Sequence, residues 1–97
     1  MSFEWDEQKR EVNIAKHGVD FEDAKHIFDG ETIEITDERQ DYREQRIGVY
    51  GEVAGRVLFV IYTLRGNNRR IISARKAGAH EREKYYAQIA ARSASEE

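Results

Sequence analysis

The stretch RRIISARKAGAHEREKYY, residues 69–86, gathers cationic and aromatic side chains around a strand-like IISA segment. Arg69 and Arg70 precede that segment, Arg75 and Lys76 follow it, and a pair of tyrosines closes the stretch. The planar guanidinium of arginine matches phosphate oxygens, and a tyrosine can stack on a base or move a proton. The chain has no cysteine, so its chemistry must come from His, Tyr, Arg, Lys and carboxylates. The stretch is typical of a site that binds an anion.

Charge is divided unevenly along the chain. Residues 1–52 carry seven Lys/Arg against fifteen Asp/Glu, a net charge of −8, whereas residues 53–97 carry nine against four, a net charge of +5. A cationic surface on an otherwise acidic protein favours a polyanionic partner. Mutual neutralisation of the two halves across the fold explains the asymmetry equally well, so charge alone does not decide between them.

The sequence shows no pattern typical of a metal site, a cofactor site, a membrane helix or a signal peptide. The three histidines lie at no familiar metal-ligand spacing, and there is neither a glycine-rich phosphate loop nor a serine-nucleophile elbow, so we expect no metal and no cofactor. The longest apolar run, residues 57–62, is far shorter than the roughly 20 residues of a membrane helix. The acidic first residues are unlike a signal peptide. We therefore expect a cytoplasmic protein that does not enter a membrane.

The first third of the chain predicts a short strand and two helices. The 97 residues suffice for one domain, which we expect over residues 1–92, with a frayed tail at residues 93–97. A strand at residues 2–5 precedes Asp6, a good N-cap for a helix that runs to about His17, where Gly18 supplies the stop. Asp20 is the expected N-cap of a second helix through Phe28.

The remainder predicts a sheet and a last helix. Alternating apolar residues predict strands in ETIEIT, EQRIGVYG and NNRRIISARK, and GRVLFVIYTLRG predicts a further strand that is apolar on both faces. Short connections join the last three, which predicts an antiparallel meander whose central strand is residues 56–65. A helix from His80 to about Arg92 follows. The expected fold is α+β: two N-terminal helices packed on an antiparallel sheet, made of the short N-terminal strand and the meander, with a C-terminal helix.

Alternation along the strands predicts which cations share a face. Arg46, Arg65 and Arg75 are expected together on the outward face, with Tyr50 beside them. Three guanidiniums repel one another unless an anion lies between them, so this face predicts a phosphate site. Pairing of each arginine with a carboxylate of the first half is the alternative. The residues expected to point inward are Ile47, Val49, Leu58, Val60, Tyr62, Leu64, Ile72 and Ala74, and those expected outward include Thr63 and Ser73.

Five segments together resemble the BrnT toxin family, the ribonuclease halves of type II toxin-antitoxin systems, which have a RelE-like fold. They are FEWDEQK, NIAKHGVDFEDAKHIF, ERQDYREQRIGVYG, GRVLFVIYT and RRIISARKAGAHEREKYY, and they cover the chain from Phe3 to about Tyr86. The resemblance implies a toxin that cleaves RNA and inhibits translation. It also implies neutralisation by a BrnA-type antitoxin with a ribbon-helix-helix DNA-binding fold, and contact with operator DNA only through that complex. The catalytic positions that it implies are His17, Arg65, Arg75, Lys76 and Tyr85.

Metal-independent RNA cleavage fits these residue types. The ribose 2′-hydroxyl is the nucleophile, so the protein must remove its proton, stabilise charge on phosphorus and protonate the leaving oxygen. Arg65 and Arg75 suit the second task, and Lys76, Tyr85 or His17 suits the others. Tyr85 could instead stack on a base or pack in the core. The alternative function is a non-catalytic adaptor whose basic face binds nucleic acid or an acidic protein. The expected RNA contacts are Arg46, Tyr50, Arg69 and Arg70.

Overall fold

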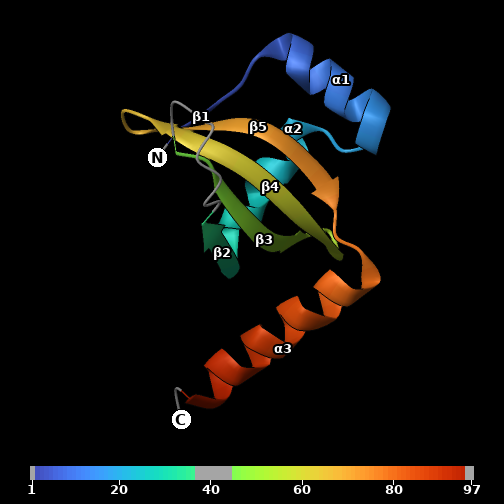
Figure 1. The fold of residues 1–97 in the computed structure, drawn as a ribbon, viewed down its shortest axis with the longest axis vertical. Coiled ribbons are helices and arrows are strands. Elements are labelled where there is room, and N and C mark those ends of the chain that lie inside the picture. The colour runs from blue at the N-terminus through green and yellow to red at the C-terminus, as the bar shows by residue number, and fades with distance from the viewer. Residues whose placement is uncertain (1, 37–44, 96–97) are drawn as a thin grey trace.

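The computed structural model describes residues 2–36 and 45–95. The last two residues of the expected tail therefore lie outside the described part. Figure 1 shows a sheet with α2 behind it, α1 along one edge and α3 projecting from one end. In chain order the elements are β1 (Ser2–Glu4), α1 (Glu7–His17), α2 (Phe21–Ala24), the 3-10 helix η1 (Lys25–Asp29), β2 (Thr32–Thr36), β3 (Ile47–Val53), β4 (Arg56–Arg65), β5 (Asn68–Lys76) and α3 (Ala79–Ser95).

The five strands form one mixed sheet in the order β1-β5-β4-β3-β2. The antiparallel meander of β3, β4 and β5 is confirmed, and β4 is its centre. Our expectation of a wholly antiparallel sheet is wrong for β1, which pairs with β5 in parallel. Because β1 and β5 run the same way, α1 can follow β1 and continue beside the rest of β5 (Figure 1).

The helices begin where their caps predict. The Asp6 carboxylate accepts hydrogen bonds from the backbone N–H groups of Gln8 and Lys9, and Gly18 ends α1 in the left-handed conformation at φ 69°. Asp20 caps the second helix, which tightens into the 3-10 helix η1 after four residues. The last helix, α3, ends at Ser95, three residues beyond the predicted Arg92.

The main core lies between the α2–η1 segment and one face of the sheet. Phe21, Ala24 and Ile27 are fully buried, as their helical spacing predicts, and they pack with strand residues such as Leu58 and Val60. The approach is close: a Cβ on Gly51 of β3 would stand 2.7 Å from Cβ of Ile27. This glycine therefore allows η1 to pack directly on β3.

A one-residue bulge in β5 changes the predicted side-chain alternation. Tyr62 is paired with Ile71, whereas Ile61 is paired with Ser73, so Ile72 is the extra residue. Ile71 is consequently buried in the core, and our expectation that Ile72 occupies that position is wrong. Leu64, also expected inward, is 51% exposed, because it lies near the end of β4 beyond the helices that cover the core.

The other expected inward residues, Ile47, Val49, Leu58, Val60, Tyr62 and Ala74, are buried. Thr63 is buried too, and its hydroxyl donates to the carbonyl of Gln45.

Asn13 joins α1 to the edge of β5. Its side-chain Nδ2 donates to the backbone oxygens of Ala74, at 2.8 Å, and Val19, at 2.9 Å. Its Oδ1 accepts from the backbone N–H of Ala74 at 3.2 Å. β1 pairs with β5 only as far as Arg70, so the Asn13 amide satisfies backbone groups that no strand covers at Ala74. Asn13 is 5% exposed, which makes this polar contact part of the buried structure.

The Asn13 contact predicts a large stability effect. Asn13→Ala leaves the buried N–H and C=O of Ala74 and the C=O of Val19 without their side-chain partner. We expect the free energy of unfolding to fall by about 2–4 kcal/mol, measured by urea denaturation. Glu11→Ala, at an exposed position of α1, is the matched control and should change it by less than about 0.5 kcal/mol. Equal stabilities of the two variants would contradict the anchoring role.

Candidate functional site

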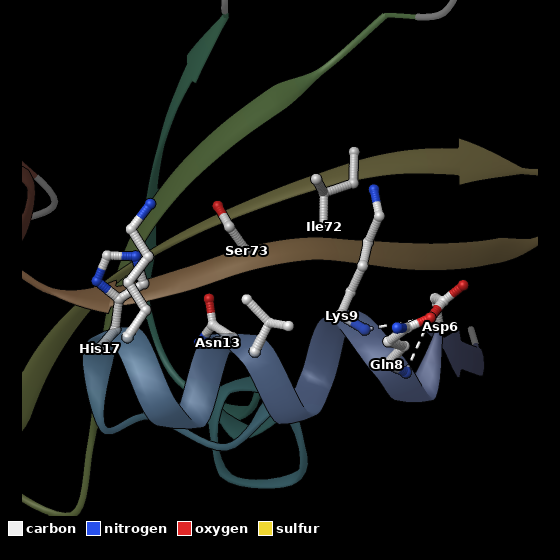
Figure 2. Close-up of a pocket in the computed structure, with 9 residues that line it drawn as sticks. Asp6, Gln8, Lys9, Asn13, His17, Ile72 and Ser73 are labelled. Carbon is white, nitrogen blue, oxygen red and sulfur yellow. Dashed lines mark hydrogen bonds between the residues drawn. The ribbon is translucent and has the colours of Figure 1, made fainter.

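An open groove of about 450 Å³ lies between α1 and β5. Figure 2 shows Lys9 and His17 at its two ends, with Asn13 and Ser73 between them. The helix supplies one wall because residues 9, 13 and 16 recur at i, i+4 and i+7 on one face. The residues that line the groove are Asp6, Gln8, Lys9, Val12, Asn13, Lys16, His17, Ile72 and Ser73.

The groove is cationic, although α1 belongs to the acidic half of the chain. Lys9, Lys16 and His17 line it, and Asp6 is the one acidic residue among the described lining residues. The Asp6 carboxylate is already bonded to the first turn of α1, with distances of 2.8 Å to Gln8 N and 3.1 Å to Lys9 N. An anion that entered the groove would therefore meet the two lysines with little competition from the one carboxylate that lines it.

A second polar cluster lies on the outward face of the sheet, around Glu81. Arg75 binds the Glu81 carboxylate with both ends of its fork, Nη1 to Oε1 and Nη2 to Oε2, each at 2.9 Å. The backbone N–H of Gly78 donates to Oε1 at 2.8 Å, and the Tyr50 hydroxyl donates to Oε2. Hydrogen bonds from Arg75 above all lower the pKa of Glu81 to about 2, with further contributions from Tyr50 and Gly78. The carboxylate is therefore charged at any physiological pH.

A row of cross-strand neighbours supports this cluster. Tyr50 of β3 is paired with Phe59 of β4, which in turn is paired with Arg75 of β5. The rings of Tyr50 and Phe59 are 4.5 Å apart, and the Arg75 guanidinium carbon is 4.9 Å from the Phe59 ring centre. Burial, followed by the Glu81 carboxylate, raises the pKa of Tyr50, so its hydroxyl stays protonated and can donate.

The groove and the Glu81 cluster adjoin each other on β5. Ser73 lines the groove, and Arg75 lies two residues further along the strand on the same face. Asn13 fixes α1 at Ala74, and His17 is one helical turn beyond Asn13. Figure 1 shows that this end of α1 lies towards the end of β5 that leads into α3. His17 and Arg75 therefore belong to the same end of the sheet, with Lys76 as the last residue of β5.

Arg65 does not join Arg75, contrary to our expectation. Arg65 is paired with Asn68 beside the β4–β5 turn, whereas Arg75 is opposite Phe59. Arg65 is six residue steps along β4 from Phe59, which corresponds to roughly 20 Å of strand. Arg46 precedes Ile47, which is paired with Tyr62, so it lies towards the Arg65 end. The separation of Arg65 from Arg75 follows from the antiparallel hairpin of β4 and β5. In such a hairpin, a residue near the turn pairs with a residue near the turn, and Arg75 lies far from it.

Two other predicted RNA contacts, Arg69 and Arg70, make contacts within the fold. The Arg69 guanidinium lies 4.1 Å from the ring centre of Phe28, with Phe3 and Tyr62 at 5.8 and 5.6 Å. Arg70 donates to Glu4 of β1 at 2.7 Å. Since β1 contributes only three residues to the sheet, these contacts help to hold it against β5. Arg69 and Arg70 are thus engaged with β1 and the core.

Tyr85 is placed as a packing residue. It is 6% exposed, and it clusters with Val57 and Ala77. Its hydroxyl donates to the backbone oxygen of Glu31 at 2.8 Å, directly before β2, and burial raises its pKa. Our expectation that this hydroxyl stands over the end of β5 is therefore wrong, because β2 is at the other edge of the sheet.

Sequence reasoning missed Glu81, Ser73, Lys9 and Lys16 as members of the site. A signal existed for the lysines, because their helical spacing places them on the Asn13 face of α1. Glu81 stands three residues after Gly78, the spacing at which a Glu reaches back to an N-terminal N–H group. Its contact with Arg75 depends on the turn between β5 and α3, which the pattern of residues does not specify.

Residues 2–36 and 45–95 contain no cluster of three or more His, Asp or Glu side chains arranged to hold a metal ion. Within the same ranges, no helix combines the length and apolarity that crossing a membrane requires.

Comparison with known proteins identifies a family. No curated protein matches the chain. A family model does match residues 5–81, and its description is the ribonuclease toxin, BrnT, of a type II toxin-antitoxin system. The matched range runs from Trp5 to Glu81, so it contains α1, four of the strands and the Arg75–Glu81 pair. The chain therefore belongs to the BrnT family of ribonuclease toxins of type II toxin-antitoxin systems.

Proposed function

We propose that this BrnT-family toxin is a metal-independent endoribonuclease with a RelE-like fold, which cuts RNA in the α1–β5 groove and so inhibits translation. The observation that carries the proposal is the cationic groove, which Lys9, Lys16 and His17 line and whose strand wall, β5, also bears Arg75. Lysine and arginine suit the phosphates of an RNA strand, and an imidazole can both accept and donate a proton.

The proposed reaction needs three protein contributions. The ribose 2′-oxygen loses its proton and attacks the adjacent phosphorus, and the bond to the 5′-oxygen breaks. The products are a 2′,3′-cyclic phosphate and a 5′-hydroxyl, which takes up a proton. We assign the two proton transfers to His17 and Lys76, and the stabilisation of charge on phosphorus to Arg75 with Lys9 and Lys16. Arg65 and Tyr85 are left out of this set, since one is distant from Arg75 and the other is buried.

The proposed partner is a BrnA-type antitoxin with a ribbon-helix-helix fold, through which the toxin would reach operator DNA. A toxin is most simply silenced where it binds its substrate, so we expect acidic and apolar antitoxin residues to cover the groove and the Arg75 face. Both surfaces are reachable, because the Arg75 side chain is 40% exposed and the groove is open.

The cleavage chemistry can be tested directly. The purified protein should cut single-stranded RNA in excess chelator and leave 2′,3′-cyclic phosphate ends, because the 2′-hydroxyl of the substrate is the nucleophile. The measurement is product-end analysis of a synthetic RNA, with and without added Mg²⁺. Activity that appears only with Mg²⁺ would contradict metal independence. Binding without any cleavage would instead favour a non-catalytic adaptor, which needs the same cationic surface.

His17 should be the side chain whose loss is felt most in catalysis. We expect His17→Gln to lower the cleavage rate by about 10²-fold or more, the range for one acid-base group, with little change in RNA affinity. His26→Gln is the matched control, since His26 is exposed on η1 and contacts Asp29 away from the groove. Equal rates in the two variants would place the acid-base group elsewhere.

For Tyr85 we expect a substitution to change stability and not the cleavage rate. Tyr85→Phe removes only the hydroxyl that donates to Glu31, so the free energy of unfolding should fall by about 1 kcal/mol. The cleavage rate should stay within about twofold of the parent, because the ring and its contacts remain. A tenfold loss of rate at unchanged stability would return Tyr85 to the catalytic set.

A further inference from the structure

Donors from three residues converge on one carboxylate at the start of α3. Glu81 accepts two N–H bonds from Arg75, one O–H bond from Tyr50 and one N–H bond from Gly78. We call Arg75, Tyr50 and the Gly78 N–H the anion cradle. Its donors come from β5, β3 and the β5–α3 connection, so the fold brings them together independently of Glu81 itself. The Glu81 carboxylate is the anion that fills it.

The chemistry of the cradle is that of a phosphate site. The two parallel N–H groups of an arginine match two oxygens of a phosphate as well as they match two oxygens of a carboxylate. A backbone N–H at a helix start and a protonated phenol add donors that carry no competing negative charge. An RNA phosphodiester presents the same pair of oxygens, and it can replace the carboxylate without any new protein group.

The remaining structure keeps the cradle shaped when Glu81 leaves. The Arg75 guanidinium rests against the Phe59 ring, and that ring is flanked by Tyr50. Phe59 has room because a Cβ on Gly48 would stand 2.6 Å from its ring, so only glycine leaves that space. Stacking on an aromatic ring holds a guanidinium without neutralising its charge. The donors therefore stay close to their bound geometry.

Glu81 is carried by a helix that buries little of its own surface. All residues of α3 are described, and Tyr85 is the one that is buried. Figure 1 shows α3 projecting from the end of the sheet. The Glu81 side chain is 30% exposed, so a rotation of that side chain towards solvent suffices to open the cradle. The strongest contacts of the first turn of α3 to the sheet are those that a phosphate would replace.

We propose that the anion cradle is a phosphate subsite for RNA, and that Glu81 occupies it in the free toxin and must be displaced by the substrate. This inference rests on the function proposed above. It adds that the Glu81 carboxylate competes with the RNA phosphate for Arg75. Glu81 then lowers the affinity for RNA, and it also selects for ligands that can bring a phosphate to this position. A ligand without such an anion leaves the pair of Arg75 and Glu81 intact.

The first test removes the negative charge of Glu81 and keeps its shape. Gln is the other residue that completes this helix-capping arrangement, so Glu81→Gln should preserve the bond from Gly78. The probe is a 2′-O-methyl RNA oligonucleotide, which cannot be cleaved, so that affinity is measured apart from chemistry. We expect its Kd to fall at least about fivefold. The matched control, Glu83→Gln, removes the same charge from an exposed position of α3 and should change the Kd less than twofold.

A second probe does not depend on RNA. Inorganic phosphate is titrated into the parent and into Glu81→Gln while the Arg75 Nε–H resonance is followed by NMR. We expect a saturable shift in the variant at phosphate concentrations that leave the parent unchanged. In addition, Arg75→Lys keeps one positive charge but loses the fork, and it should weaken binding of the oligonucleotide about tenfold or more. If Glu81→Gln proves unstable, the oligonucleotide affinity of Arg75→Lys shows whether the cradle binds phosphate.

The outcomes separate the inference from the proposed function. If the parent cleaves RNA but the Kd values of Glu81→Gln and Arg75→Lys equal that of the parent, the cradle is not a phosphate subsite and Glu81 is a structural ion pair. If the parent neither cleaves nor binds RNA, the proposed function fails, and the phosphate titration alone decides whether the cradle takes an anion. Looser oligonucleotide binding by Glu81→Gln than by Glu83→Gln would also overturn the inference.

Discussion

The position of α1 depends on one side-chain amide. A strand edge exposes backbone donors and acceptors that must find partners, and β1 covers only the first part of the β5 edge. Asn13 supplies both a donor and an acceptor to Ala74, so a helix is fastened where a strand would otherwise pair. This contact sets the distance between α1 and β5, and thereby the width of the groove. The lysines of α1 and His17 then face β5 because they share the helix surface of Asn13.

Some of the basic residues stabilise the fold, whereas others are those that we propose for binding the substrate. Arg69 and Arg70 are neighbours in sequence, yet one is stacked on aromatic rings and the other is paired with Glu4. Both secure β1, whose three residues bury too little surface to hold it alone. The chain thus uses part of its basic stretch to complete the sheet. In the proposed function, the substrate contacts the basic groups of α1 and of the far end of β5 instead.

Much of the fold was predictable because local rules and the final structure agree. Asp6 and Gly18 set the ends of α1, alternation located β2, β3 and β5, and a continuous apolar run located β4. The parallel pairing of β1 could not be read from the chain, because three residues carry no signal for the direction of a partner 60 or more positions away. The bulge at Ile72 was equally hidden, since Ile71 and Ile72 are chemically identical and packing alone chooses which one turns inward.

The parallel pairing also has a consequence for synthesis on the ribosome. β1 and α1 leave the ribosome well before their partners Asn68–Arg70 and Ala74, which follow about 60 residues later in the chain. Contacts of such long sequence separation form late and make folding slow. A nascent chain that has not yet reached β5 has neither a docked α1 nor a groove. The groove can therefore assemble only after β5 has been made, and the order of the strands along the chain sets this delay.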